Sequence, residues 1–107
     1  MVVKSVEVKE LKKWLDTGDA VLVDVRELQE YQAAAIPGSK HIPMGNICGY
    51  MLPETGDKKL VLHCQKGGRS GSCCAKLLAE NSDIEVYNLE GGIVAWAEAG
   101  FPVVAGK

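Results

Sequence analysis

Apolar and polar positions alternate along the chain in two different periods, which predict a regular succession of strands and helices. Short apolar runs of strand length separate segments in which apolar residues recur every three or four positions. The clearest strand is 20–25, where five of six residues are apolar without alternation, as in a strand buried on both faces. The clearest helix is 8–16, where Leu11, Trp14 and Leu15 share one face and Gly18 follows as a stop.

The remaining elements follow from the same periods and from the residues that end them. A helix over 27–35 must end before Pro37, because the residue before a proline avoids the helical region. The other predicted strands are 2–3, 40–43, 60–63 and 85–89, and the other predicted helices are 71–80 and 93–99. Residues 46–52 carry no clear period and are compatible with a helical turn, and 53–57 read as a loop.

This alternation predicts a single α/β domain over residues 1–107. Strands that alternate with helices form a mainly parallel sheet, here of five strands, with helices on both faces and therefore three layers. A chain of 107 residues has the size of one domain with one core, and no repeat, linker or low-complexity segment divides it. Because ligands bind at the carboxyl ends of the strands in such sheets, we expect the functional residues there.

Composition and charge exclude some classes of partner. The content of 47% apolar and 24% charged residues is that of a soluble globular protein. A net charge of −2 gives no reason to expect nucleic acid or an anionic membrane as a partner. No stretch approaches the roughly 18 apolar residues of a membrane span, and the N-terminus lacks the apolar core of a signal peptide. We therefore expect a cytoplasmic protein.

The strongest chemical signal is the segment between strand 60–63 and helix 71–80, which reads Cys-Gln-Lys-Gly-Gly-Arg-Ser from Cys64 to Ser70. The backbone N–H groups of a glycine-bearing loop and the positive end of the following helix converge on one point, which makes a cradle for an anion. Lys66 and Arg69 add two positive charges. These features stabilise a thiolate, so we expect Cys64 to have a lowered pKa and to act as a nucleophile.

The other residues of the segment are expected to serve this nucleophile. Four of them contribute mainly backbone N–H groups: Gln65, Gly67, Gly68 and Ser70. The two glycines permit left-handed or close-approach conformations that a side chain would block. Ser70 is in addition a candidate N-cap of the following helix.

Each charged residue near this segment has two interpretations. Lys66 either attracts an anionic substrate or is solvated like most lysines, with equal weight. For Arg69, a salt bridge that braces the loop is at least as well supported as direct contact with a substrate. Asp24 and Arg26 end a strand at the same edge of the sheet, and we expect a charge pair that organises the loop.

The other cysteines are expected to be reduced thiols, since the chain shows no secretory signal and is large enough to fold without disulfides. Cys73 and Cys74 lie in the following helix, where we expect one of them to face the core; a resolving role towards Cys64 is a minor alternative. The role of Cys48 is open. His63 precedes Cys64 on a strand and points to the opposite face, which argues against a Cys-His dyad. No paired C-x-x-C spacing is present, so no metal site is expected.

Four segments resemble the signatures of the rhodanese family of sulfurtransferases, in its short single-domain form. They are 22–31, 36–43, the Cys64 loop of 64–70, and 89–103. Any one of them is weak, but all four occur in the right order and together cover nearly the whole chain. One departure is Ala34-Ala35, which stands where the family often has Gly-His.

The resemblance implies a rhodanese-like three-layer fold and transfer of sulfur through a Cys64 persulfide. The thiolate would take the sulfane sulfur of an anionic donor such as thiosulfate and then pass it to cyanide or a thiol. No metal or organic cofactor is required, and we expect a monomer.

Two alternatives stay open. The first is a protein that serves a protein partner. It is either a persulfide carrier, which differs from the enzyme only in its acceptor, or a docking module without catalysis, which the presence of Cys64 and Arg69 disfavours. A cysteine phosphatase has five residues between its cysteine and arginine, whereas four lie between Cys64 and Arg69. The shorter loop suits a single sulfur atom better than a phosphate.

Overall fold

The centre of the molecule is a five-stranded sheet in the order β1-β5-β4-β2-β3, in which every neighbouring pair is parallel. The structure is a computed structural model that describes residues 3–46 and 52–106. Its strands are β1 (Lys4–Val6), β2 (Ala20–Asp24), β3 (Lys40–His41), β4 (Lys59–His63) and β5 (Val86–Leu89). The predicted α/β class and the parallel five-stranded sheet are confirmed.

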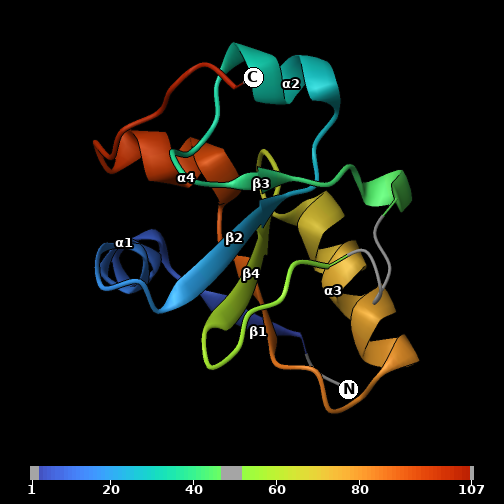
Figure 1. The fold of residues 1–107 in the computed structure, drawn as a ribbon. Coiled ribbons are helices and arrows are strands. Elements are labelled where there is room, and N and C mark those ends of the chain that lie inside the picture. The colour runs from blue at the N-terminus through green and yellow to red at the C-terminus, as the bar shows by residue number, and fades with distance from the viewer. Residues whose placement is uncertain (1–2, 47–51, 107) are drawn as a thin grey trace.

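Helices cover both faces of this sheet and complete three layers (Figure 1). Helices α1 (Val8–Asp16) and α4 (Gly92–Glu98) pack on one face, and α3 (Gly68–Glu80) packs on the other. The short helix α2 (Leu28–Ala33) follows the carboxyl end of β2, and a 3₁₀ turn spans Met44–Asn46. None of the helices in the described parts of the chain has the length and apolar character needed to cross a membrane.

The side chains of β4 point alternately to the two faces of the sheet, so they contribute to two separate parts of the core. Leu60 and Leu62 pack with residues of α3 such as Leu77, whereas Val61 packs with Leu11 of α1 and Trp96 of α4. Successive side chains of a strand point to opposite faces, so a strand covered by helices on both sides must be apolar throughout. This explains the unbroken apolar runs of β2 and β4.

The predicted element bounds were wrong by two or more residues at four places. Helix α2 ends at Ala33 rather than at residue 35, β3 ends at His41 rather than at residue 43, and the first strand and the start of α3 also differ. The first strand is Lys4–Val6 rather than 2–3: Val3 precedes it, Val2 lies outside the described residues, and pairing with β5 decides its position. Helix α3 begins at Gly68 rather than at residue 71, because Gly67 with a φ of 106° is already its N-cap. The ambiguous segment 46–52 lies mostly outside the described residues, as does Cys48.

The N-terminus of α4 is tied to the chain that leaves β4. The N–H of Ile93 donates to the carbonyl oxygen of Cys64 at 3.0 Å, and the N–H of Val94 donates to that of Gln65 at 3.1 Å. Gly92 lies so close to these two carbonyl groups that a Cβ on it would overlap with them, and its φ is +60°. Position 92 therefore requires glycine for both space and conformation.

We expect Gly92→Ala to lower the free energy of unfolding by about 1–3 kcal/mol more than Gly100→Ala, because only the first adds overpacking against the backbone. Gly100 is the matched control, since its φ is also positive, at +83°, but no atom lies within 4 Å of a Cβ built on it. Urea unfolding of both variants measures the difference. Equal losses of unfolding free energy in the two variants would show that the backbone after β4 shifts to make room for the added Cβ.

Candidate active site

The sulfur of Cys64 lies at the base of a turn of backbone that follows β4. Its Sγ accepts the N–H of Gly67 at 3.1 Å, and the N–H groups of Lys66 and Ser70 also hydrogen-bond to it. We call this set of amides around the sulfur the cradle. Cys64 is only 1% exposed. Above it opens a pocket of about 380 Å³, which is lined by Cys64, Gln65, Lys66, Gly68 and Arg69.

The early start of α3 changes the roles of three loop residues. Gly67 is left-handed, as expected, but Gly68 has no positive φ and no protein atom lies within 4 Å of a Cβ built on it, so the prediction of a left-handed conformation at position 68 is wrong. Ser70 lies in the first turn of α3, and Gly67 is the N-cap without any side-chain cap bond. The prediction that Ser70 caps the helix is therefore also wrong.

Ser70 and Asn88 hold the cradle from the side of β5. The buried Ser70 Oγ lies 3.4 Å from Cys64 Sγ and 2.5 Å from Asn88 Oδ1, while Asn88 Nδ2 donates to the carbonyl oxygen of Gly67 at 3.1 Å. The hydroxyl has one proton, so it donates to one acceptor at a time. The sequence analysis missed Asn88; its only signal is a polar amide on a strand of an otherwise buried sheet.

These contacts give Cys64 the properties of a reactive thiol. Burial alone would raise its pKa, but the hydrogen bonds from the Ser70 hydroxyl and from the backbone amides of Ser70, Gly67 and Lys66 lower it below the ordinary value. Burial raises the pKa of Cys74 to about 12 and, together with the charge of Cys64, raises that of Cys73. Cys73 and Cys74 are both buried, whereas only one of them was expected to face the core. A raised pKa disfavours a resolving role for Cys73.

Arg69 forms a two-pronged ion pair with Glu30 of α2. The Nη1–Oε1 and Nη2–Oε2 distances are 2.7 and 2.8 Å. Glu30 also accepts the N–H of Glu27 and so completes a capping box at the start of α2. The Arg69 guanidinium lowers the pKa of Glu30 to about 2. Of the two interpretations of Arg69, the structure shows the bracing salt bridge. Glu30 belongs to the first family signature, but the sequence analysis did not predict its role.

Asp24 and Arg26 form the expected charge pair, and it is buried. Arg26 Nη2 lies 2.7 Å from Asp24 Oδ2, and the same guanidinium reaches the carbonyl oxygen of Ala34. His63 Nε2 lies 3.6 Å from Asp24 Oδ2, and its Nδ1 lies 3.2 Å from the carbonyl oxygen of Cys64. Burial lowers the pKa of His63 more than Asp24 raises it, so a neutral ring donates to that carbonyl. The His63 ring thus lies between the charge pair and the Cys64 backbone, but its Nε2 has no hydrogen-bond partner among the described residues.

Comparison with known proteins agrees with this geometry. Residues 7–99 match the rhodanese-like domain. The chain belongs to that family. It is 40% identical to a sulfurtransferase of Allochromatium vinosum over 84% of this chain and 83% of the relative. It is 32% identical to the thiosulfate sulfurtransferase GlpE of Pseudoalteromonas translucida over 92% of this chain and 93% of the relative. A crystal structure of a rhodanese-related protein from Thermoplasma volcanium superposes with a TM-score of 0.80 at 28% identity, covering 94% and 97% of the two chains.

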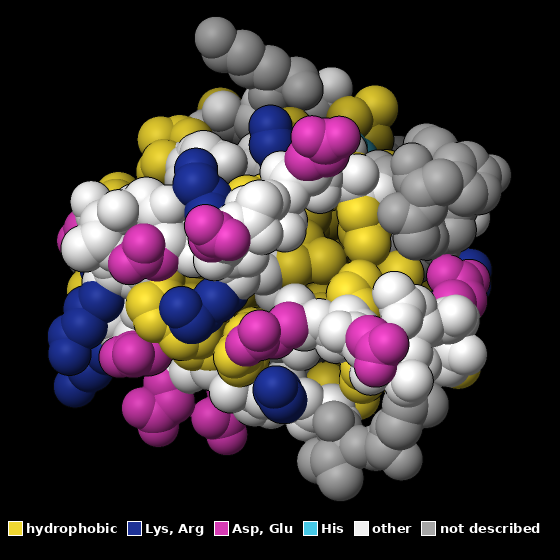
Figure 2. Space-filling view, turned by 60° about the horizontal axis from the view of Figure 1, so that its bottom comes forward, with side chains coloured by type: hydrophobic (Ala, Val, Ile, Leu, Met, Phe, Trp, Pro, Cys, Tyr) yellow, Lys and Arg dark blue, Asp and Glu magenta, His cyan; other side chains and the backbone are white. Residues whose placement is uncertain are grey.

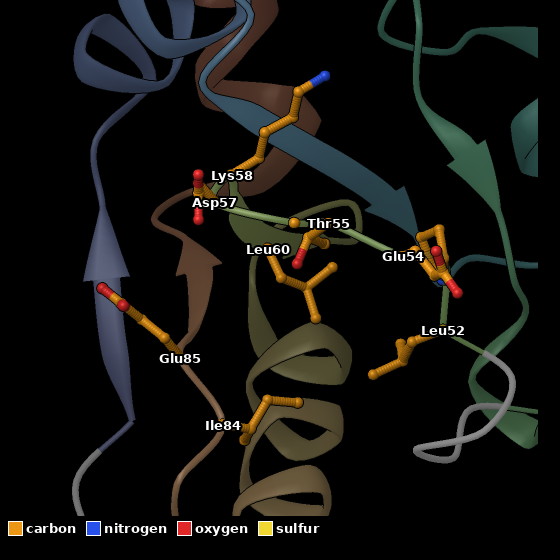
Figure 3. A pocket seen from close by; sticks show the side chains of 10 residues that line it. Leu52, Glu54, Thr55, Asp57, Lys58, Leu60, Ile84 and Glu85 are labelled. Carbon is orange, nitrogen blue, oxygen red and sulfur yellow. The ribbon is translucent and has the colours of Figure 1, made fainter.

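This rhodanese-like domain also has a hollow of about 640 Å³ at the amino ends of β4 and β5, far along the sheet from Cys64. Leu52, Leu60 and Ile84 turn into it, and carboxylates of Glu54 and Glu85 stand around it (Figure 3). Figure 2 brings this end forward and shows hydrophobic side chains in the hollow with acidic side chains on the surrounding surface. None of its described lining residues is a cysteine or a histidine, so the cradle remains the candidate active site.

We expect Ser70→Ala to raise the pKa of the Cys64 thiol, because the serine hydroxyl gives the largest of the hydrogen-bond contributions that lower it. The pH dependence of alkylation by iodoacetamide, followed on the peptide that contains Cys64, measures this pKa. Ser72→Ala is the matched control, since Ser72 is exposed on the same helix. An unchanged pKa in Ser70→Ala would assign the effect to the backbone amides alone.

We expect Glu30→Gln to reduce the free energy of unfolding at neutral pH by about 0.5–1 kcal/mol, as is usual for a partly exposed ion pair. Because the pKa of Glu30 is lowered from 4.5 to about 2 in the folded state, the contribution is present above pH 4.5 and lost as the pH falls towards 2. The difference between the wild type and the variant should shrink over that interval. Glu98→Gln, on the exposed end of α4, is the control and should show no such trend.

Proposed function

We propose that the protein is a sulfurtransferase in which Cys64 carries a sulfane sulfur between a donor and an acceptor. The observation that carries this proposal is the position of Cys64 Sγ, which accepts hydrogen bonds from three backbone amides and has a lowered pKa. A thiolate and a persulfide are both anions, and their charges lie only one S–S bond apart, so one set of donors stabilises both. The sulfurtransferase relatives support the same chemistry.

With thiosulfate as donor, the reaction has two steps. The Cys64 thiolate attacks the outer sulfur, a new S–S bond forms, and the bond to the sulfonate sulfur breaks, so that its electron pair leaves with sulfite. In the second step cyanide or a thiolate attacks the outer sulfur of the persulfide, and the Cys64 thiolate is released. Neither step needs a metal or an organic cofactor.

The charged residues around Cys64 have two roles in this proposal: one attracts the donor, and the others position the loop. Lys66 lines the pocket over Cys64 and attracts the anionic donor. Arg69 positions the loop against α2 through Glu30, and Asp24 and Arg26 support it from β2. A protein that accepts sulfur from the persulfide would use the same Cys64 chemistry and differ only in the second step. Phosphate chemistry is disfavoured, because Arg69 is already engaged by a carboxylate.

We expect treatment with thiosulfate to release sulfite and to add about 32 Da, the mass of one sulfur atom, to the peptide that contains Cys64. Cys64→Ser should abolish both. The separate tryptic peptide that contains Cys73 and Cys74 is an internal control and should stay unmodified. Hydrolysis of an aryl phosphate without any sulfur transfer would contradict the proposal, and binding of a partner without persulfide formation from any donor would favour the docking module.

A further inference from the structure

The Ser70 hydroxyl lies between two acceptors, and only one of them is the reactive sulfur. Ser70 Oγ is 3.4 Å from Cys64 Sγ and 2.5 Å from Asn88 Oδ1. The second distance is at the short end of the range for O–H···O hydrogen bonds. Because the hydroxyl has one proton, a bond that it donates to Asn88 is lost to Cys64.

The loop after β4 determines which atom of the Asn88 amide faces this hydroxyl. Asn88 Nδ2 donates to the carbonyl oxygen of Gly67 at 3.1 Å, and since a carbonyl oxygen can only accept, Oδ1 is the atom that faces Ser70. The N–H of Gly71 also donates to the Gly67 carbonyl, at 3.0 Å, so both lone pairs of that oxygen have a donor. The Ser70 hydroxyl lies 3.4 Å from the same oxygen, but the two closer donors leave it a choice between Cys64 Sγ and Asn88 Oδ1.

Within the described part of the chain, Ser70 provides the one side-chain hydrogen bond to Cys64 Sγ. The ring of His63 is neutral, and the pKa of Cys73 is raised, so neither carries a charge when Cys64 is a thiolate at neutral pH. The charged side chains beside the sulfur are Lys66, which lines the pocket, and Arg69, which is paired with Glu30. The Ser70 hydroxyl is therefore the donor whose direction can change with the state of the sulfur.

Building on the proposed function, we propose that Asn88 is a positioning residue that shares the proton of Ser70 with Cys64: the hydroxyl donates to Sγ in the thiolate and to Asn88 Oδ1 in the persulfide. A thiolate carries its charge on Sγ and draws the proton, because hydrogen bonds to an ionised acceptor are about twice as strong as neutral ones. In a persulfide Sγ is bonded to two atoms and the charge lies on the outer sulfur, so Oδ1 is the better acceptor. The O–H bond rotates between the two, and no covalent bond forms or breaks.

Two variants of similar shape should move the pKa of Cys64 in opposite directions. Asn88→Leu removes the competing acceptor and should lower the pKa by about 0.5–1, the value of one net hydrogen bond. Asn88→Asp supplies a charged acceptor, which takes the proton and repels the thiolate, and should raise the pKa. The pH dependence of alkylation by iodoacetamide measures both. Each variant loses the Nδ2 donor to Gly67, so a residue that only braced the loop would give a raised pKa in both and would overturn the proposal.

The same substitution without the serine proton separates sharing from a general effect on the loop. In the Ser70→Ala background there is no proton to share, so Asn88→Leu should no longer lower the pKa of Cys64. A lowering that persists without Ser70 would contradict the proposal, as would an unchanged pKa in Asn88→Leu alone. Asn81→Leu and Asn81→Asp are matched controls, because Asn81 is exposed at the opposite end of α3, and they should leave this pKa unchanged.

The persulfide state has a separate test, which is the ratio of persulfide to free thiol on the Cys64 peptide at a fixed ratio of thiosulfate to sulfite. We expect Asn88→Leu to lower this ratio about three- to tenfold, because the persulfide loses the acceptor for Ser70. Mass spectrometry of the wild type and the variant measures it. An unchanged ratio would overturn the role of Asn88 in the persulfide and leave the proposed function intact. Absence of persulfide in the wild type with any sulfane donor would instead overturn the proposed function, and the pKa values of the variants would still decide whether Asn88 shares the proton.

Discussion

Two hydrogen bonds from the start of α4 determine which way the peptide groups after β4 face. In a trans peptide the C=O of one residue and the N–H of the next point to opposite sides. Because Val94 holds the carbonyl oxygen of Gln65 towards α4, the N–H of Lys66 is turned away from α4 and reaches Cys64 Sγ. The cradle therefore depends on a contact with a helix far along the chain, and Gly92 is the residue that lets the two backbones come so close.

The electrostatics of the site rest on these oriented amides more than on formal charge. The guanidinium of Arg69 is balanced by Glu30, and that of Arg26 by Asp24. Amide dipoles that are fixed before the reaction stabilise an anion without rearranging, which suits the proposed alternation of Cys64 between a thiolate and a persulfide. The Arg69–Glu30 pair holds the loop against α2, and the Asp24–Arg26 pair joins the end of β2 to the carbonyl oxygen of Ala34 after α2, so the contribution of both pairs is positional.

Local patterns predicted the fold well and the site only in part. Helix Val8–Asp16 was predicted with its observed bounds, because its apolar face and its glycine stop are both local signals. The start of α3 was missed because Gly68 and its neighbours have the composition of a loop, and the left-handed Gly67 that begins the helix has no signal of its own. Glu30 binds Arg69, 39 positions along the chain, and Asn88 binds Ser70, 18 positions away. The local pattern of apolar and polar residues does not predict such long-range contacts.

The shelter of Cys64 restricts which atoms reach it. Cys64 is 1% exposed, so its sulfur at the base of the cradle is reached best by an atom that projects from its own molecule, as a terminal sulfane sulfur does. A phosphorus atom surrounded by four oxygens must instead bring the oxygens into the loop, and the loop has four residues between Cys64 and an arginine already held by Glu30.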